Sequence, residues 1–324
     1  MHGNGFLVIL GKNRERMKKS FAVEESRCEM LFRDLRPCWH LYTPENNPIL
    51  FQDEADYRVA MTLLALCCLC FPSIRVLTFQ WMSNHLHIVL SGPQEDISKL
   101  FSMLKKYLGQ YLKGIGRSNG FGDWEFKLRE IEDLKDIRNV IAYTNRNGYI
   151  VHQNTTPFSY PWGANRYFFN PEADLRFGNC TGKIRLRTIR QISHTHCLDG
   201  FAGKPFMDGI VPPPVFCDIR TAEGLYRNAH LYFWMVSKNV EGMKGVAEHI
   251  GESIYYTDED LFSVVLRVCQ DRYGVGRVSL LPAQAKLDIA RQMHFEYNAT
   301  DKQIARILKL DLPVLASLWP GVEK

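Results

Sequence analysis

Two strand-like segments separated by a short polar turn constrain the fold of this chain most strongly: residues 75–80 and 85–90. The first is rich in β-branched and aromatic residues, and residues 91–93, Ser-Gly-Pro, end the second. The pattern predicts two adjacent strands with Ser83 and Asn84 at or near the turn.

The second strand carries a pair of histidines. Residues two apart on a strand face the same way, so His85 and His87 should project side by side, with Leu86 turned into the core. Two neutral imidazoles on a rigid sheet are half of a site for a divalent metal. The alternative is a partly buried pair satisfied by hydrogen bonds. A second pair, His194 and His196, lies in a basic, irregular stretch, and we assign it no metal.

The surrounding pattern alternates strands and helices. We expect a strand over 38–43, a helix over 53–71, the two strands above, a helix over about 96–117, a strand over 125–130 and a helix over about 132–147 that Gly148 ends. The order β-α-β-β-α-β-α predicts an α+β fold, a ferredoxin- or RRM-like antiparallel sheet with flanking helices. Sheets of this kind can also bind single-stranded nucleic acid.

The rest of the chain divides by composition. Residues 1–36 form a charged N-terminal arm, 171–218 a basic, irregular linker rich in Pro and Gly, and 219–324 a mostly α-helical region. Capping boxes begin helices at Thr257 and Thr300. The last helices, about 283–319, suit a helix-turn-helix unit, and a generic three-helix interaction module fits almost as well.

The net charge of the chain is only mildly positive, at +5, so any contact with nucleic acid must come from local stripes of basic residues. Two stripes are candidates for binding DNA phosphates: one on the helix 96–117, the other on residues 183–190, which alternate as a strand with one basic face would. The alternative for the first is a solvated helix face. The residues are Lys99, Lys106, Lys113 and Arg117 on the helix, and Arg185, Arg187 and Arg190 on the strand.

Nine cysteines, an odd number, indicate a reducing compartment and not a disulfide framework. Zinc binding by Cys180, Cys197 and Cys217 is disfavoured because their spacing is irregular. The N-terminus lacks a signal-peptide pattern, and the apolar residues 60–72 are too few to span a bilayer. We therefore expect a cytoplasmic protein with no membrane partner.

A third ligand and a nucleophile can be sought on the helix 132–147. Tyr143 and Asn147 are four residues apart and share one face of that helix. The Asn147 oxygen suits a hard cation such as Mg²⁺ or Mn²⁺. Tyrosine can act as a covalent nucleophile, and here it would lie within reach of an oxygen that the metal polarises. Alone, this spacing more often reflects core packing; its weight comes from His85 and His87.

The segment Asn84-His85-Leu86-His87-Ile-Val-Leu resembles the His-hydrophobic-His (HUH) signature of single-tyrosine transposases, and Tyr143-x-x-x-Asn147 resembles their nucleophile helix. The branch it is most similar to is the REP-associated tyrosine transposases of the IS200-like superfamily. In these, Tyr-x-x-x-Asn-Pro precedes a Tyr-Pro-Trp segment. Here Gly148 replaces the proline, and residues 160–162 are Tyr-Pro-Trp. The resemblance covers residues 37–170.

The resemblance implies a metal-dependent DNA strand transferase and endonuclease active in DNA transposition and recombination. Tyr143 would attack single-stranded DNA and form a 5′-phosphotyrosine link, while His85, His87 and Asn147 would hold Mg²⁺ or Mn²⁺. The partner would be single-stranded DNA with hairpins, and the location the nucleoid of a bacterial cytoplasm. The chain could work as a homodimer.

Three rivals stay open. A replication-initiator or relaxase-type nickase uses the same chemistry, but the chain has one candidate tyrosine and no nucleotide-binding motif. A domesticated, non-catalytic DNA-binding regulator could keep the fold. A small metal hydrolase would need a general base, and the nearest acids in sequence, Glu130 and Glu132, are not placed at the metal by any pattern.

Overall fold

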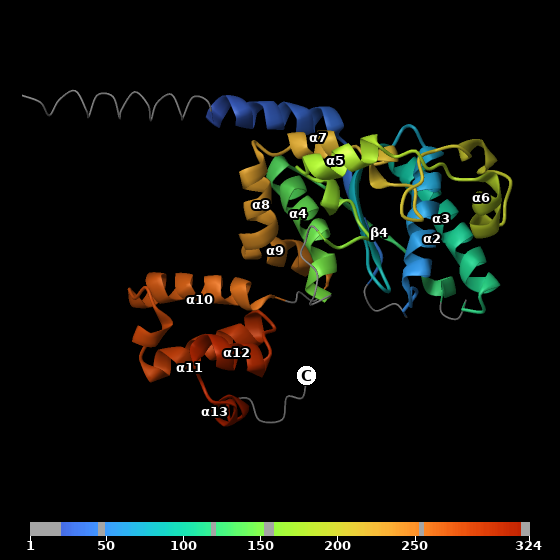
Figure 1. Cartoon of the computed structure of the whole chain (residues 1–324). Coiled ribbons are helices and arrows are strands. Elements are labelled where there is room, and N and C mark those ends of the chain that lie inside the picture. Colours follow the sequence, from blue (N-terminus) through green and yellow to red (C-terminus); the bar gives the residue numbers. More distant parts are fainter. Residues whose placement is uncertain (1–20, 45–48, 118–120, 152–158, 253–255, 319–324) are drawn as a thin grey trace, which may run out of the picture. The chain divides into compact units, whose positions relative to one another are not determined.

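The structure is a computed structural model, and it describes residues 21–44, 49–117, 121–151, 159–252 and 256–318. The chain divides into two compact units, Met1–Phe233 and Trp234–Lys324, which are coloured in sequence order in Figure 1. The first unit is α+β and contains the sheet, and the second is helical. The prediction of an α+β chain with a helical C-terminal region is confirmed at this level.

Four strands form one sheet in the order β2-β3-β1-β4, and all neighbours are antiparallel. The strands are β1 (Cys38–Tyr42), β2 (Arg75–Trp81), β3 (Leu86–Ser91) and β4 (Lys127–Glu130). β3 and β1 are central, and His87 of β3 lies opposite Tyr42 of β1 and Gln80 of β2. The two predicted strands pair as expected, but β3 begins one residue later than predicted, so that His85 directly precedes it.

The sheet has two unlike faces. One face is apolar, because the alternation of β3 places Leu86, Ile88 and Leu90 on the same side, all fully or almost fully buried. The other face carries polar side chains that are also buried, among them His87 and Gln80. Burying polar groups under a helix requires hydrogen-bond partners for them, which makes this second face the place to look for a site.

Seven labelled helices belong wholly or partly to the described part of the first unit. They are α2 (Glu54–Leu69), α3 (Gln94–Gly114), α4 (Leu134–Val151), α5 (Pro171–Gly178), α6 (Leu186–Ser193), α7 (Ile219–Gly224) and α8 (Ala229–Lys238), of which α8 continues past Phe233. Residues 21–35 are helical as well. Figure 1 shows α2 and α3 on one side of the sheet and α4 on the other. α4 thus covers the polar face.

The end of α4 differs from the prediction. Gly148 does not end the helix, which continues to Val151. A Cβ at Gly148 would meet the Gln80 carboxamide at 1.7 Å and the Tyr160 ring at 2.3 Å. Glycine at this position therefore permits close approach of α4 to β2 and to residue 160. The sequence signal was misread because glycine serves both for helix ends and for tight packing.

Residues 183–190 were predicted as a strand, and this is wrong: residues 186–193 form α6. Ile189 and Ser193, four apart, are buried, whereas Arg185, Arg187 and Arg190 are exposed. In so short a run, the pattern of basic and apolar residues fits both the strand period of two and the helix period of 3.6. The buried residues are four apart, which is the helical spacing. The expected basic strand face does not exist.

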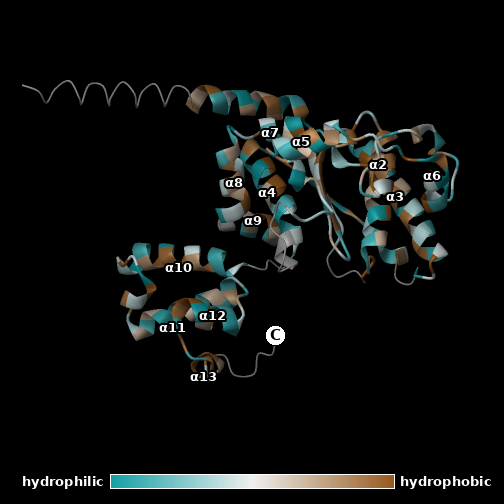
Figure 2. Ribbon diagram, viewed as in Figure 1, coloured by the Kyte–Doolittle hydropathy of each residue, from teal (hydrophilic) through white to brown (hydrophobic). Residues whose placement is uncertain are grey.

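The second unit is built from helices. They are α9 (Val240–Ile250), α10 (Asp258–Tyr273), α11 (Ala283–Glu296), α12 (Asp301–Leu308) and α13 (Leu312–Ala316). Of these, α10, α11 and α12 begin where the sequence predicted. Thr257 and Thr300 form capping boxes at the starts of α10 and α12. Figure 2 shows hydrophobic and hydrophilic segments alternating along α10, α11 and α12, as in amphipathic helices that share a core.

Candidate metal centre and nucleophile helix

The histidine pair lies at the tip of the β2–β3 hairpin. β2 ends at Trp81 and β3 begins at Leu86, and the turn between them is closed by a hydrogen bond from Met82 N to His85 O at 2.8 Å. The rings of His85 and His87 lie side by side with centroids 5.1 Å apart and planes at 89°. Both side chains are buried, with His85 8% exposed and His87 fully enclosed.

α4 brings the second motif to the first. The Asn147 carboxamide nitrogen lies 3.2 Å from His87 Nε2, and the Tyr143 ring centroid lies 5.7 Å from that of His87, edge to face. Adjacent ligands of one ion at about 2.1 Å are about 3 Å apart, so the spacing of His87 Nε2 and the Asn147 amide fits two ligands of one cation. Rotating the Asn147 carboxamide by a half turn would direct its oxygen, in place of its nitrogen, toward such a cation.

The protonation of His87 also suits a ligand. Burial lowers the pKa of His87 to about 3, so the ring is neutral at neutral pH and one nitrogen keeps a free electron pair. Tyr143 is 4% exposed, so most of its ring is covered.

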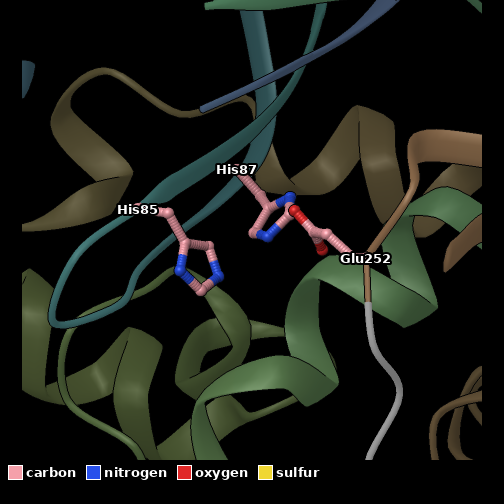
Figure 3. A group of neighbouring side chains, drawn as sticks. All are labelled: His85, His87 and Glu252. Carbon is pink, nitrogen blue, oxygen red and sulfur yellow. The ribbon is translucent and has the colours of Figure 1, made fainter. Parts of the chain in front are cut away.

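The two imidazoles lie close together at the hairpin, as Figure 3 shows for His85 and His87. A pair of imidazoles supplies part of the donor set that a divalent metal needs. Of the two acids considered from sequence, Glu130 pairs with Arg36 at 3.7 Å.

Sequence reasoning missed His40 of β1. It is fully buried, and its Nε2 lies 3.2 Å from His87 Nδ1. The signal was present, since a histidine in the predicted strand 38–43 interrupts an otherwise apolar and aromatic run. Only strand pairing reveals that it shares the polar face with His87, because pairing across strands is not encoded locally.

The Tyr-Pro-Trp segment is fixed beside β2. The Tyr160 hydroxyl donates to Trp81 O at 2.8 Å, and Trp81 N donates to Trp162 O at 2.8 Å. The Trp162 ring stacks on Tyr57 of α2, with centroids 4.9 Å apart. The segment therefore holds the hairpin next to the histidines and supplies the ring against which Gly148 packs.

The basic residues of α3 lie away from the histidines. α3 covers the face of the sheet opposite α4 (Figure 1). Lys106 and Lys113 are exposed, Lys99 pairs with Glu95 at 2.7 Å, and Arg117 forms a short ion pair with Asp56. The stripe is thus not brought to the histidine site, and Arg117 has a structural role.

The α6 arginines form a separate group. Arg190 pairs with Asp199 at 2.6 Å, whereas Arg185 and Arg187 are exposed. α6 packs against α3 and α2, so these arginines belong to the same side of the unit as the α3 lysines. His196 also contacts Asp199, at 3.3 Å.

All nine cysteines are free thiols. In the described part of the chain, Cys180, Cys197 and Cys217 do not form a cluster that could hold a metal. No helix among the described residues has the length and apolarity needed to cross a bilayer. Comparisons with models of protein families, with curated proteins and with solved structures found no match.

Proposed function

We propose that this protein cleaves and rejoins single-stranded DNA through a tyrosine nucleophile and a divalent metal, as a transposase does. One observation carries the proposal: two motifs that are far apart in the sequence meet at His87. Asn147 lies 3.2 Å from its Nε2, and the Tyr143 ring lies beside its ring. Core packing of Tyr143 and Asn147 alone would not require this meeting with a histidine pair.

His85, His87 and Asn147 would hold Mg²⁺ or Mn²⁺. When bound, the cation supplies charge stabilisation at a phosphoryl oxygen and orients the phosphate. His87 is suited to this role because burial keeps it neutral. Asn147 contributes a neutral oxygen donor, which suits hard cations.

Tyr143 would supply the nucleophile. Its phenol would lose its proton to solvent, the phenolic oxygen would form a bond to phosphorus, the P–O3′ bond would break, and the released 3′-oxygen would take up a proton from solvent. The product is a 5′-phosphotyrosine, which a free 3′-hydroxyl can attack to rejoin the strand. Because Tyr143 is 4% exposed, we expect its uncovering to make adduct formation slower than DNA binding.

The strand order β2-β3-β1-β4, with α2 and α3 inserted between strands, supports the expected ferredoxin-like arrangement of an HUH domain. DNA phosphates would contact exposed cations, for which Lys106, Lys113, Arg185 and Arg187 are candidates. Since these lie on the side of α3 and α6, a bound strand would have to pass around the sheet edge to reach Tyr143.

The test is a denaturant-resistant adduct. The full chain is incubated with Mn²⁺ and a labelled single-stranded hairpin DNA and resolved on a denaturing gel. We expect an adduct with the wild type, none with Tyr143→Phe, and a loss of at least tenfold with His85→Ala. Tyr273→Phe, in α10 of the second unit, is the matched control and should behave as the wild type. An adduct that persists in Tyr143→Phe excludes Tyr143 as the nucleophile.

The same reaction separates the rival functions. A transposase should transfer the cleaved strand to a second DNA end, and a nickase of the initiator or relaxase type should form the adduct and only close the original strand. A non-catalytic regulator should bind the hairpin and form no adduct under any metal condition.

A further inference from the structure

His87 has a different neighbour at each of its ring nitrogens. Nδ1 lies 3.2 Å from His40 Nε2, and Nε2 lies 3.2 Å from the Asn147 amide. His40 is on β1, next to β3 in the sheet, and its ring lies almost parallel to that of His87, with centroids 5.3 Å apart and an angle of 25°. Both rings are fully buried, so neither can exchange its contact for bulk water.

This arrangement restricts the tautomers of both rings. A neutral imidazole carries one proton, so one nitrogen donates and the other accepts. A cation between His87 and Asn147 needs the electron pair of His87 Nε2. The proton of His87 must then be on Nδ1, where it donates to His40 Nε2. His40 Nε2 must accept, which places the proton of His40 on its own Nδ1.

We infer that His40 is a positioning residue that holds His87 in the Nδ1–H tautomer and fixes the direction of its Nε2 electron pair. This rests on the proposed function, in which His87 is a metal ligand. Outer-shell partners of ligating histidines act in this way, and removing one commonly weakens metal binding by about 10- to 100-fold.

His85 has a matching neighbour. Its Nδ1 lies 2.8 Å from the Asn84 side-chain oxygen, which can only accept, so Nδ1 donates and the electron pair of the neutral ring lies on Nε2. The two ligands therefore have the same arrangement, each with Nδ1 held by a protein side chain. The supports differ, because Asn84 lies in the hairpin turn and His40 in a central strand.

The first readout is metal binding without DNA. Mn²⁺ is titrated into the full chain and the free ion is followed by electron paramagnetic resonance. We expect His40→Phe, which keeps the ring volume and loses the acceptor, to weaken Mn²⁺ binding about 10- to 100-fold. His40→Gln retains an acceptor and should restore binding to within about threefold of wild type. His196→Phe, an exposed histidine outside the site, should leave binding unchanged.

The second readout needs no metal. Two-dimensional ¹H–¹⁵N spectra of the imidazole nitrogens report which nitrogen of His87 carries the proton. We expect Nδ1–H in the wild type and in His40→Gln, and a mixture of tautomers in His40→Phe. If His40→Phe fails to fold, Asn84→Ala in the turn tests the same logic at His85, with an expected mixture of tautomers there.

The outcomes separate the inference from the proposed function. If the wild type binds Mn²⁺ and His40→Phe binds it equally well, with His87 still in one tautomer, the role of His40 is overturned. If the wild type binds no Mn²⁺, the metal chemistry of the proposed function fails, and the metal-free spectra still decide on His40. A wild-type His87 protonated at Nε2 overturns the inference in either case.

Discussion

Replacing Gly148 by alanine should destabilise the first unit, although alanine is the better helix former. Gly148 lies within α4, where the exchange alone favours the helix by about 1 kcal/mol. Against this, the new Cβ would lie 1.7 Å from the Gln80 carboxamide and 2.3 Å from the Tyr160 ring. Neither side chain can move freely, because both are buried and the Tyr160 hydroxyl donates a hydrogen bond to Trp81 O.

The magnitude follows from these two effects. Overpacking in a well-packed core costs about 1–3 kcal/mol, and contacts this short place Gly148→Ala at the upper end. Subtracting the helix preference leaves a net loss of about 2 kcal/mol. For a unit of this size, that lowers the unfolding midpoint by about 4–8 °C. The same displacement would move Asn147, so metal binding should weaken as well.

The assay is thermal unfolding followed by circular dichroism, with Gly245→Ala as the matched control. Gly245 also lies inside a helix, α9, but a Cβ there meets nothing within 4 Å. Gly245→Ala should therefore keep or raise the midpoint. If Gly148→Ala behaves like Gly245→Ala, the close approach of α4 to β2 and Tyr160 is refuted.

Three further changes test other parts of the structure. Burial raises the pKa of Asp56, but hydrogen bonds led by the one from Arg117 outweigh this effect and lower the pKa below 3.8. The ionised Asp56 therefore stabilises the fold above pH 3.8, and this stabilisation is lost as the pH falls through the folded-state pKa. On acidification, the urea midpoint should fall less steeply in Asp56→Asn than in the wild type. Thr257→Ala removes the α10 capping box and should cost about 1 kcal/mol in urea unfolding, with no change in metal binding. Tyr232→Phe leaves two buried amide groups without the hydroxyl that joins them and should cost about 1–3 kcal/mol, measured by urea unfolding. An unchanged midpoint in either of the last two variants would contradict the bonding described.

Much of the fold could be predicted because its signals are local. β-branched and aromatic residues indicated β2 and β3, and the capping residues Thr257 and Thr300 marked helix starts that the structure also has. The spacing of His85 and His87 gave their side-by-side placement without any knowledge of the rest of the sheet.

The remainder depends on pairing between distant segments. His40 became visible as a neighbour of His87 only once β1 was placed beside β3. The role of Gly148 depends on Tyr160, and the sequence offered helix termination as the simpler explanation. α6 was mistaken for a strand because eight residues contain too few repeats to separate two periods.

The polar face of the sheet has a consequence for how α4 is seated. Apolar contacts are non-directional and would let a helix roll or slide by small steps. Hydrogen bonds are directional, and α4 makes them along its length, from Asp136 with Arg129 to Asn147 with His87. A rotation of α4 about its axis by one residue would break all of these hydrogen bonds at once. These hydrogen bonds therefore fix the rotation of α4 about its own axis, and with it the direction in which Tyr143 faces the sheet.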